Sequence, residues 1–125
     1  QGDVENARMH LELAHAGNLQ MPALLNNLAW ALANREQPDL ARALQLAQAA
    51  NKLSNDPEIS DTIGTILARL GRHREAVKEL EAALRGFPDR PELHSKLADL
   101  YETLGDARLA ELHRQLAQQQ KKKSP

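Results

Sequence analysis

The sequence contains no cysteine, few aromatic residues and no long apolar run. Without cysteine, disulfide bonds, thiolate metal sites and cysteine nucleophiles are excluded, and the bacterial cytoplasm and periplasm both remain open as locations. A membrane-spanning helix needs about 18 consecutive apolar residues, so we expect no direct insertion into a membrane. The first residues also lack the basic, apolar and small-residue blocks of a signal peptide.

Neither sign of charge predominates, because 17 acidic residues face 16 basic ones. No field of the whole molecule would attract nucleic acid or an anionic membrane, and we expect neither as a partner. Hydrophobic residues make up 42% of the chain but aromatic residues only 2%. The core must therefore consist of alanine, leucine, isoleucine and valine, a composition that suits close packing of helices in one domain.

An internal repeat of 34 residues is the clearest feature of the sequence, because residues 57–90 superpose on 91–124. Apolar residues recur three and four apart on both sides of a central glycine, which predicts two amphipathic helices joined by a tight turn. The turn glycines are Gly71 and Gly105, and we expect both to adopt a left-handed backbone. The matching pairs are Pro57 with Pro91, Gly64 with Ala98, Leu70 with Leu104, Gly71 with Gly105, Ala76 with Ala110, and Ala83 with Ala117.

The pattern extends towards the N-terminus with a longer turn near residues 34–38 and then with half of a further unit. Pro38 and Asp39 read as the start of a second helix, since proline and an acid both suit a first turn. The expected helices cover 3–17, 22–34, 38–53, 57–70, 73–86, 91–104 and 106–120, and a disordered basic tail covers 121–125. No segment has the alternation of a strand, so the predicted class is all-α.

A 34-residue helix-turn-helix period with small residues at these offsets resembles the tetratricopeptide repeat family. The unit that fits best contains Ile63, Gly64, Leu67, Gly71, Ala76, Leu80, Ala83 and Pro88. The resemblance implies an α-solenoid, a right-handed superhelix formed by a single array over 1–120, with a half repeat at 1–21 and repeats at 22–56, 57–90 and 91–120. Of the aromatic positions of the family, only Tyr101 is filled by an aromatic residue. Segments 26–30 and 61–64 are also similar to bacterial multi-repeat proteins, including lipoproteins linked to exopolysaccharide export.

The resemblance implies a function without chemistry: a protein or peptide held in a concave groove lined by the first helix of each pair. Five acids on this face oppose only Arg69 and Lys96, a local charge of about −3, so a neutral-to-basic partner is expected. Trp30 either anchors the partner or packs against the preceding helix. The expected groove residues are Asn26, Asn27, Trp30, Asn34, Glu58, Asp61, Thr62, Thr65, Arg69, Glu92, Ser95, Lys96, Asp99, Glu102 and Thr103.

Family members that clamp the carboxylate tail of chaperones are a poor match. Trp30 stands where that clamp has an asparagine, Glu92 where it has a lysine, and only Lys96 fits. An alternative function is a structural spacer or self-association segment of a larger bacterial assembly. The last helix is expected to cap the array, because Arg114 stands where the preceding repeat has the packed Leu80. The first helix lacks such polar residues. We therefore expect the C-terminal part of a longer protein and a possible homodimer through that first helix.

Chemical motifs are absent, and the histidines do not form a recognisable site. No phosphate loop, nucleophile elbow or zinc-protease motif is present, so no catalytic residue, cofactor or metal is predicted. His10 and His15 are five apart and do not share a helix face, and the other three histidines lie in different predicted helices with no carboxylate at ligand spacing. We interpret all five as surface or packing residues. They are His10, His15, His73, His94 and His113.

Overall fold

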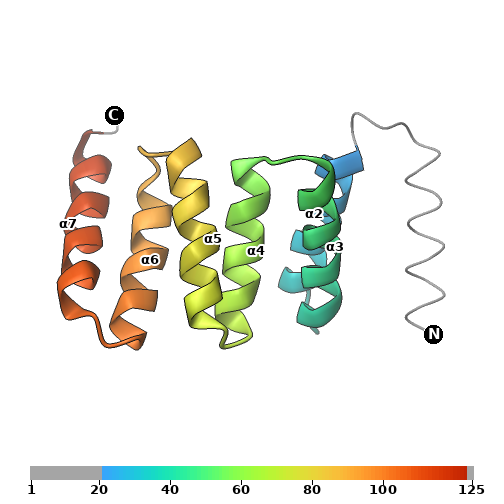
Figure 1. The fold of residues 1–125 in the computed structure, drawn as a ribbon, viewed down its shortest axis with the longest axis horizontal. Helices are drawn as coiled ribbons and strands as arrows, with labels where there is room; N and C mark the ends of the chain where they lie inside the picture. The colour runs from blue at the N-terminus through green and yellow to red at the C-terminus, as the bar shows by residue number, and fades with distance from the viewer. Residues whose placement is uncertain (1–20, 124–125) are drawn as a thin grey trace.

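The computed structural model describes residues 21–123, and this part of the chain forms α-helices without strands. The helices lie side by side in a row, and successive helices form paired hairpins (Figure 1). The predicted all-α class with paired helices is confirmed. The expected helix at 3–17, with its half repeat, lies outside the described residues. The helices are α2 (Met21–Asn34), α3 (Leu40–Leu53), α4 (Pro57–Arg69), α5 (His73–Gly86), α6 (Pro91–Thr103) and α7 (Ala107–Lys123).

Local signals in the sequence explain where the helices of the middle hairpin begin and end. Asp56 precedes α4 and accepts a hydrogen bond from the Glu58 amide at 2.9 Å, while Pro57 occupies the first turn. After α4 the chain reverses at Gly71, whose φ is 81°, and Gly105 has a φ of 87° at the same place after α6. A Cβ at either glycine would meet no atom within 4 Å, so backbone conformation alone favours glycine there.

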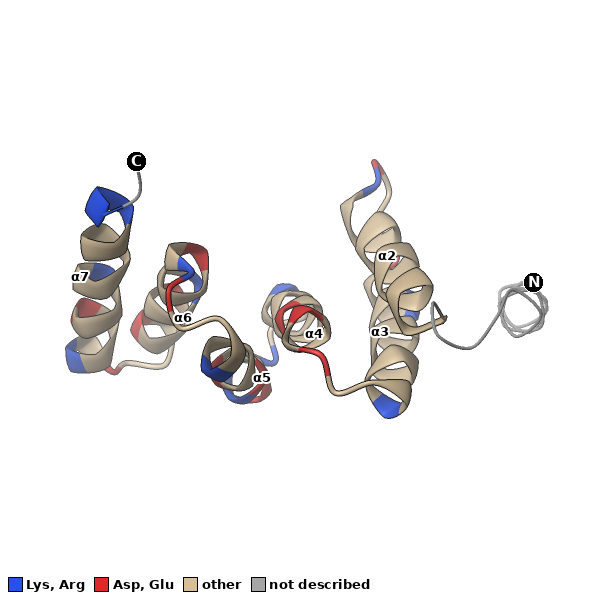
Figure 2. Ribbon diagram, turned by 90° about the horizontal axis from the view of Figure 1, so that it is seen from above, with Lys and Arg blue, Asp and Glu red and all other residues tan. Residues whose placement is uncertain are grey.

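The row of helices has an inner and an outer side. Helix α4 contacts both α2 and α6, whereas α3, α5 and α7 do not contact one another. The first helices of the hairpins are therefore closer together than the second helices, and the inner, concave side is lined by α2, α4 and α6. Charged residues are concentrated on α4 to α7, whereas α2 contains none and α3 only Arg42 and Lys52 (Figure 2).

Small residues let the helices approach closely around a leucine and isoleucine core. Nine alanines of the described residues are at most 1% exposed, and the largest fully buried side chains are Leu46, Ile66, Leu80, Leu93 and Leu97. One close approach is at Gly64 of α4, where a Cβ would lie 2.7 Å from Cγ of Leu80 in α5. Interiors packed at this density leave no room for an added methyl group without movement.

Two expected boundaries were wrong. Helix α3 begins at Leu40 and not at Pro38, because Asp39 acts as the N-cap and accepts a hydrogen bond from the Arg42 amide at 3.1 Å. The tail expected to be disordered from residue 121 is helical through Lys123. Glutamine and lysine are good helix formers, and lysines in a last turn interact favourably with the helix dipole.

Candidate functional site

A hollow of about 270 Å³ on the inner side lies between α4 and α6 and is floored by α5. We name it the α4–α6 groove. Its apolar part consists of Ala68, Leu80 and Leu100, and Leu80 and Leu100 are almost completely buried. The full lining is Thr65, Ala68, Arg69, His73, Leu80, Lys96, Asp99, Leu100 and Thr103, so five of the expected groove residues meet here.

The 34-residue period explains why these side chains come together. Thr65 and Arg69 are four apart and share one face of α4, and the residues 34 positions later, Asp99 and Thr103, share the same face of α6. Since α4 and α6 are neighbours, both pairs border one hollow. The repeat pattern alone therefore predicts this juxtaposition.

Polar side chains connect adjacent repeats across the inner side. The Lys96 ammonium lies 2.8 Å from the Asp61 carboxylate and donates a hydrogen bond to the Thr65 hydroxyl at 2.9 Å. The Arg69 guanidinium donates to the backbone carbonyl of Ala33 at 2.6 Å. Lys96 ties α6 to α4, and Arg69 ties α4 to the end of α2.

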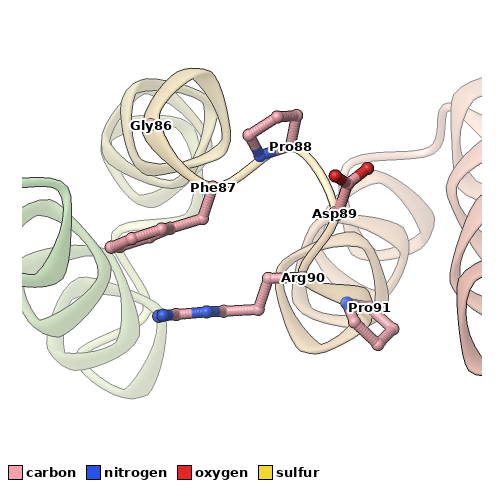
Figure 3. Close-up of a pocket in the computed structure, with 6 residues that line it drawn as sticks. All are labelled: Gly86, Phe87, Pro88, Asp89, Arg90 and Pro91. Atoms are coloured by element: carbon pink, nitrogen blue, oxygen red, sulfur yellow. The ribbon is translucent and has the colours of Figure 1, made fainter. Parts of the chain in front are cut away.

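Two arginines from outside the predicted set neutralise most of the acids on this face. Arg90 lies 2.8 Å from Glu58 and 3.8 Å from Asp61, and its guanidinium stacks on the Phe87 ring at 3.8 Å (Figure 3). Arg114 of α7 pairs with Glu102 and lies 3.7 Å from Asp99.

With these arginines the five acids oppose four bases, a local charge of about −1. The expected value of −3 was wrong, because long arginine side chains fold back from the neighbouring loop and helix. A strong attraction for basic ligands therefore has no basis in net charge.

The remaining expected residues lie outside the groove lining. Thr62, expected to be exposed, is only 6% exposed and donates a hydrogen bond to the Glu58 carbonyl at 3.1 Å, since α4 packs against α2, α3, α5 and α6. On α2, Trp30 is 47% exposed, so about half of the ring remains open to solvent. The others are Asn26, Asn27 and Asn34 on α2, Glu58 and Asp61 on α4, and Glu92, Ser95 and Glu102 on α6.

Two histidines that the sequence does not connect meet between α6 and α7. The Nδ1 atoms of His94 and His113 are 2.9 Å apart, and both residues are buried. Burial lowers the pKa of His113, an effect that Glu81 partly opposes. No group of three metal-ligating side chains lies within residues 21–123. A buried histidine pair 19 residues apart has no signature in the sequence, because it depends on how two helices face each other.

Another surface hollow offers fewer free groups that could bind a ligand. A hollow of about 480 Å³ beside α6 is formed by residues 86–91, from the end of α5 to the first residue of α6 (Figure 3). Its Arg90 is already engaged by the Phe87 ring and by Glu58. No helix among residues 21–123 is long and apolar enough to cross a membrane.

Comparison with known proteins agrees with the repeat architecture. Residues 57–100 match the tetratricopeptide repeat family. TPR repeat-containing thioredoxin TTL4 of Arabidopsis thaliana is 40% identical over 74 residues, which are 58% of this chain and 11% of that protein. The chain thus spans about one ninth of that relative.

Two solved structures of MamA have a similar fold. MamA MSR-1 superposes with a TM-score of 0.76 at 22% identity, over 99% of this chain and 71% of that one. MamA AMB-1 gives a TM-score of 0.76 at 21% identity, over 99% and 67%. Residues 57–100 are therefore similar to tetratricopeptide repeats, and the helix pairs of residues 21–123 have a tetratricopeptide-repeat-like fold.

Proposed function

We propose that this chain is a non-catalytic binding module that holds an extended segment of a partner protein in the α4–α6 groove. The observation that carries the proposal is the hollow of about 270 Å³ with a floor of Ala68, Leu80 and Leu100. Ligand sites are typically concave and apolar with a few polar groups that fix orientation. Here Thr65, Asp99 and Thr103 would supply the polar groups around the apolar floor.

The groove suits one apolar side chain of the ligand, flanked by polar or basic residues. The Asp99 side chain is 81% exposed and lies 3.7 Å from Arg114, so its carboxylate remains accessible to a ligand cation. Because the face carries only about −1, we expect a modest preference for neutral or basic segments over acidic ones. Salt should weaken this preference.

Trp30 offers a second anchor on the same inner side. Its ring is 47% exposed on α2, and large exposed aromatic side chains are frequent anchors in interfaces. The neighbouring residues Asn27 and Asn34 are exposed amides, although Asn34 already donates to the Trp30 carbonyl at 2.8 Å. A ligand long enough to pass from α6 across α4 to α2 would contact both anchors.

A second candidate function is a structural spacer or self-association segment of a larger bacterial assembly. The links from Lys96 to Asp61 and from Arg69 to Ala33 favour it, since these groove side chains already serve to hold the repeats together. A spacer would bind no peptide in its groove. A molecular mass that rises with protein concentration would indicate self-association.

A peptide-library selection followed by titration at two ionic strengths tests the proposal. Thr103→Trp places a bulky ring at the rim of the groove, and Gln48→Trp places the same ring at an exposed position of α3 on the outer side. We expect Thr103→Trp to weaken binding about tenfold or more and Gln48→Trp to leave it within about twofold. Equal effects of the two substitutions, or a selection dominated by acidic peptides, would contradict the proposal.

A further inference from the structure

The buried His94–His113 pair is a polar contact that the groove does not use. His94 of α6 is 4% exposed and His113 of α7 is 7% exposed, and their Nδ1 atoms are 2.9 Å apart. The rings stack with centroids 5.1 Å apart, and the ring of Tyr101 stacks on His113 at 5.6 Å. The preceding hairpin has Ser60 and Glu79 at the corresponding places, so the pair occurs only in the last hairpin of the described chain.

The number of protons on the two rings decides whether this contact can exist. A hydrogen bond between two Nδ1 atoms needs one Nδ1–H donor and one Nδ1 lone pair. Two neutral rings meet this requirement, and so does a pair with one added proton. When both rings are protonated, both Nδ1 atoms carry hydrogen, and two positive charges face each other at hydrogen-bond distance. The second proton therefore converts an attraction into a repulsion.

Few neighbouring groups can compensate for those charges. From α5, the Glu81 carboxylate lies 3.7 Å from Nε2 of His113, and it also accepts a hydrogen bond from the Tyr101 hydroxyl at 3.1 Å. From α6, Tyr101 faces the pair, and burial, followed by the charge of Glu81, raises its pKa, so it stays neutral in acid. Asp106 in the turn before α7 acts on Tyr101. One carboxylate can balance one imidazolium, but not two.

The direction of the pH effect follows from the burial of His113. Burial lowers its pKa below the ordinary histidine value of 6.5, with Glu81 opposing and His94 adding to the shift. The folded state therefore binds protons less readily than the unfolded state. The stabilisation that the neutral pair gives to the folded state is present above pH 6.5. It is lost as the pH falls below this value towards the folded-state pKa of His113.

We propose that the His94–His113 pair is an acid-sensitive latch that holds the terminal helix α7 on α6, and that double protonation of the pair releases α7. The other side-chain links of α7 are exposed at its surface, such as Arg114 to Glu102 and Gln120 to the Pro88 carbonyl. Exposed pairs of this kind contribute little to stability. His113 is the largest of the three buried residues of α7, beside Ala110 and Ala117, so a repulsion at the pair acts on the main buried contact of the helix. Acid would then uncover the face of α6 that α7 now covers.

Amide hydrogen exchange of the full chain at pH 7.5 and pH 5.0, corrected for the intrinsic rate, tests this latch. We expect protection of α7 relative to α4 and α5 to fall about tenfold or more in acid. His113→Phe keeps a stacking ring but cannot be protonated, so its α7 protection should change less than about twofold. The matched control His10→Phe removes a histidine that precedes the described residues and should behave as the unaltered chain. Unchanged relative protection in the unaltered chain, or the same acid loss in His113→Phe, would overturn the proposal.

Nitrogen-15 spectra of the histidine rings in the unaltered chain provide a test that needs no substitution. At neutral pH we expect one ring of the pair to carry its hydrogen on Nδ1 and the other on Nε2. The tautomeric pattern should disappear over the same pH range in which α7 loses protection. Two rings that titrate independently near pH 6.5, with no change in α7, would show that the pair is not a latch.

Discussion

Gly64→Ala tests the close approach of α4 to α5 that defines each hairpin. The added Cβ would lie 2.7 Å from Cγ and 2.8 Å from Cδ2 of Leu80, and 3.3 Å from the carbonyl oxygen of Ala76. Leu80 is 1% exposed, and the only space beside it that we describe is the α4–α6 groove that it floors. Overpacking of this kind costs about 1–3 kcal/mol, and the upper half of that range applies to a neighbour this buried.

The helix propensity of alanine acts in the opposite direction. Alanine in a helix interior is favoured over glycine by about 1 kcal/mol. Since the overpacking term is larger, we expect Gly64→Ala to lower the free energy of unfolding by about 1–2 kcal/mol. In a Leu80→Ala background the clash is gone, and the same substitution should stabilise by about 1 kcal/mol.

Urea unfolding of the unaltered chain, Gly64→Ala, Leu80→Ala and the double variant measures both the expected destabilisation and the expected stabilisation. Ala98→Gly is the matched control, because Ala98 stands at the same place in the next repeat and the residue corresponding to Leu80 is Arg114, which turns away to pair with Glu102. This control should destabilise by about 1 kcal/mol from propensity alone. If Gly64→Ala stabilises the unaltered chain by about 1 kcal/mol, α4 and α5 are not as close as described.

Four further substitutions at three positions test the turns, the link between repeats and the exposed ring. Gly71→Val should lower the free energy of unfolding by about 1–3 kcal/mol and Gly71→Asn by less, because only the backbone conformation opposes a side chain there; equal effects in urea unfolding would refute this. Lys96→Met should cost less than about 1 kcal/mol, because its link to Asp61 is partly exposed, and the cost should shrink in 1 M salt; a cost that salt leaves unchanged would contradict an ionic link. Trp30→Ala should change stability by less than about 0.5 kcal/mol while weakening binding of a selected peptide; a larger loss on heating would show that the ring packs in the core.

The periodic features of the fold were predictable from the sequence. Helix ends were predicted within a few residues, because capping residues, prolines and turn glycines act locally, as Asp56 and Gly71 illustrate. The meeting of Thr65, Arg69, Asp99 and Thr103 in one groove was also predictable, since a 34-residue period places equivalent residues on one side of the array.

Contacts made by long side chains between repeats were not predictable. Whether Arg90 reaches Glu58 depends on how the loop before α6 places its backbone, and no local pattern encodes that placement. The burial of Thr62 likewise depends on how closely the neighbouring helices pack on α4. The rings of His94 and His113 face each other only because α6 and α7 have particular rotations about their axes. Helical periodicity predicts which broad face of a helix is buried, but not its rotation to this precision.

The claim that the α4–α6 groove binds a partner segment is tested most directly by NMR titration of the chain with a peptide from the selection. The account predicts saturable shift changes centred on Thr65, Ala68, Leu100 and Thr103, with little change at outer-side residues 45–52 of α3. Thr103→Trp should abolish the changes in the groove. Saturable changes centred on residues 45–52, with the groove residues unaffected, would contradict it.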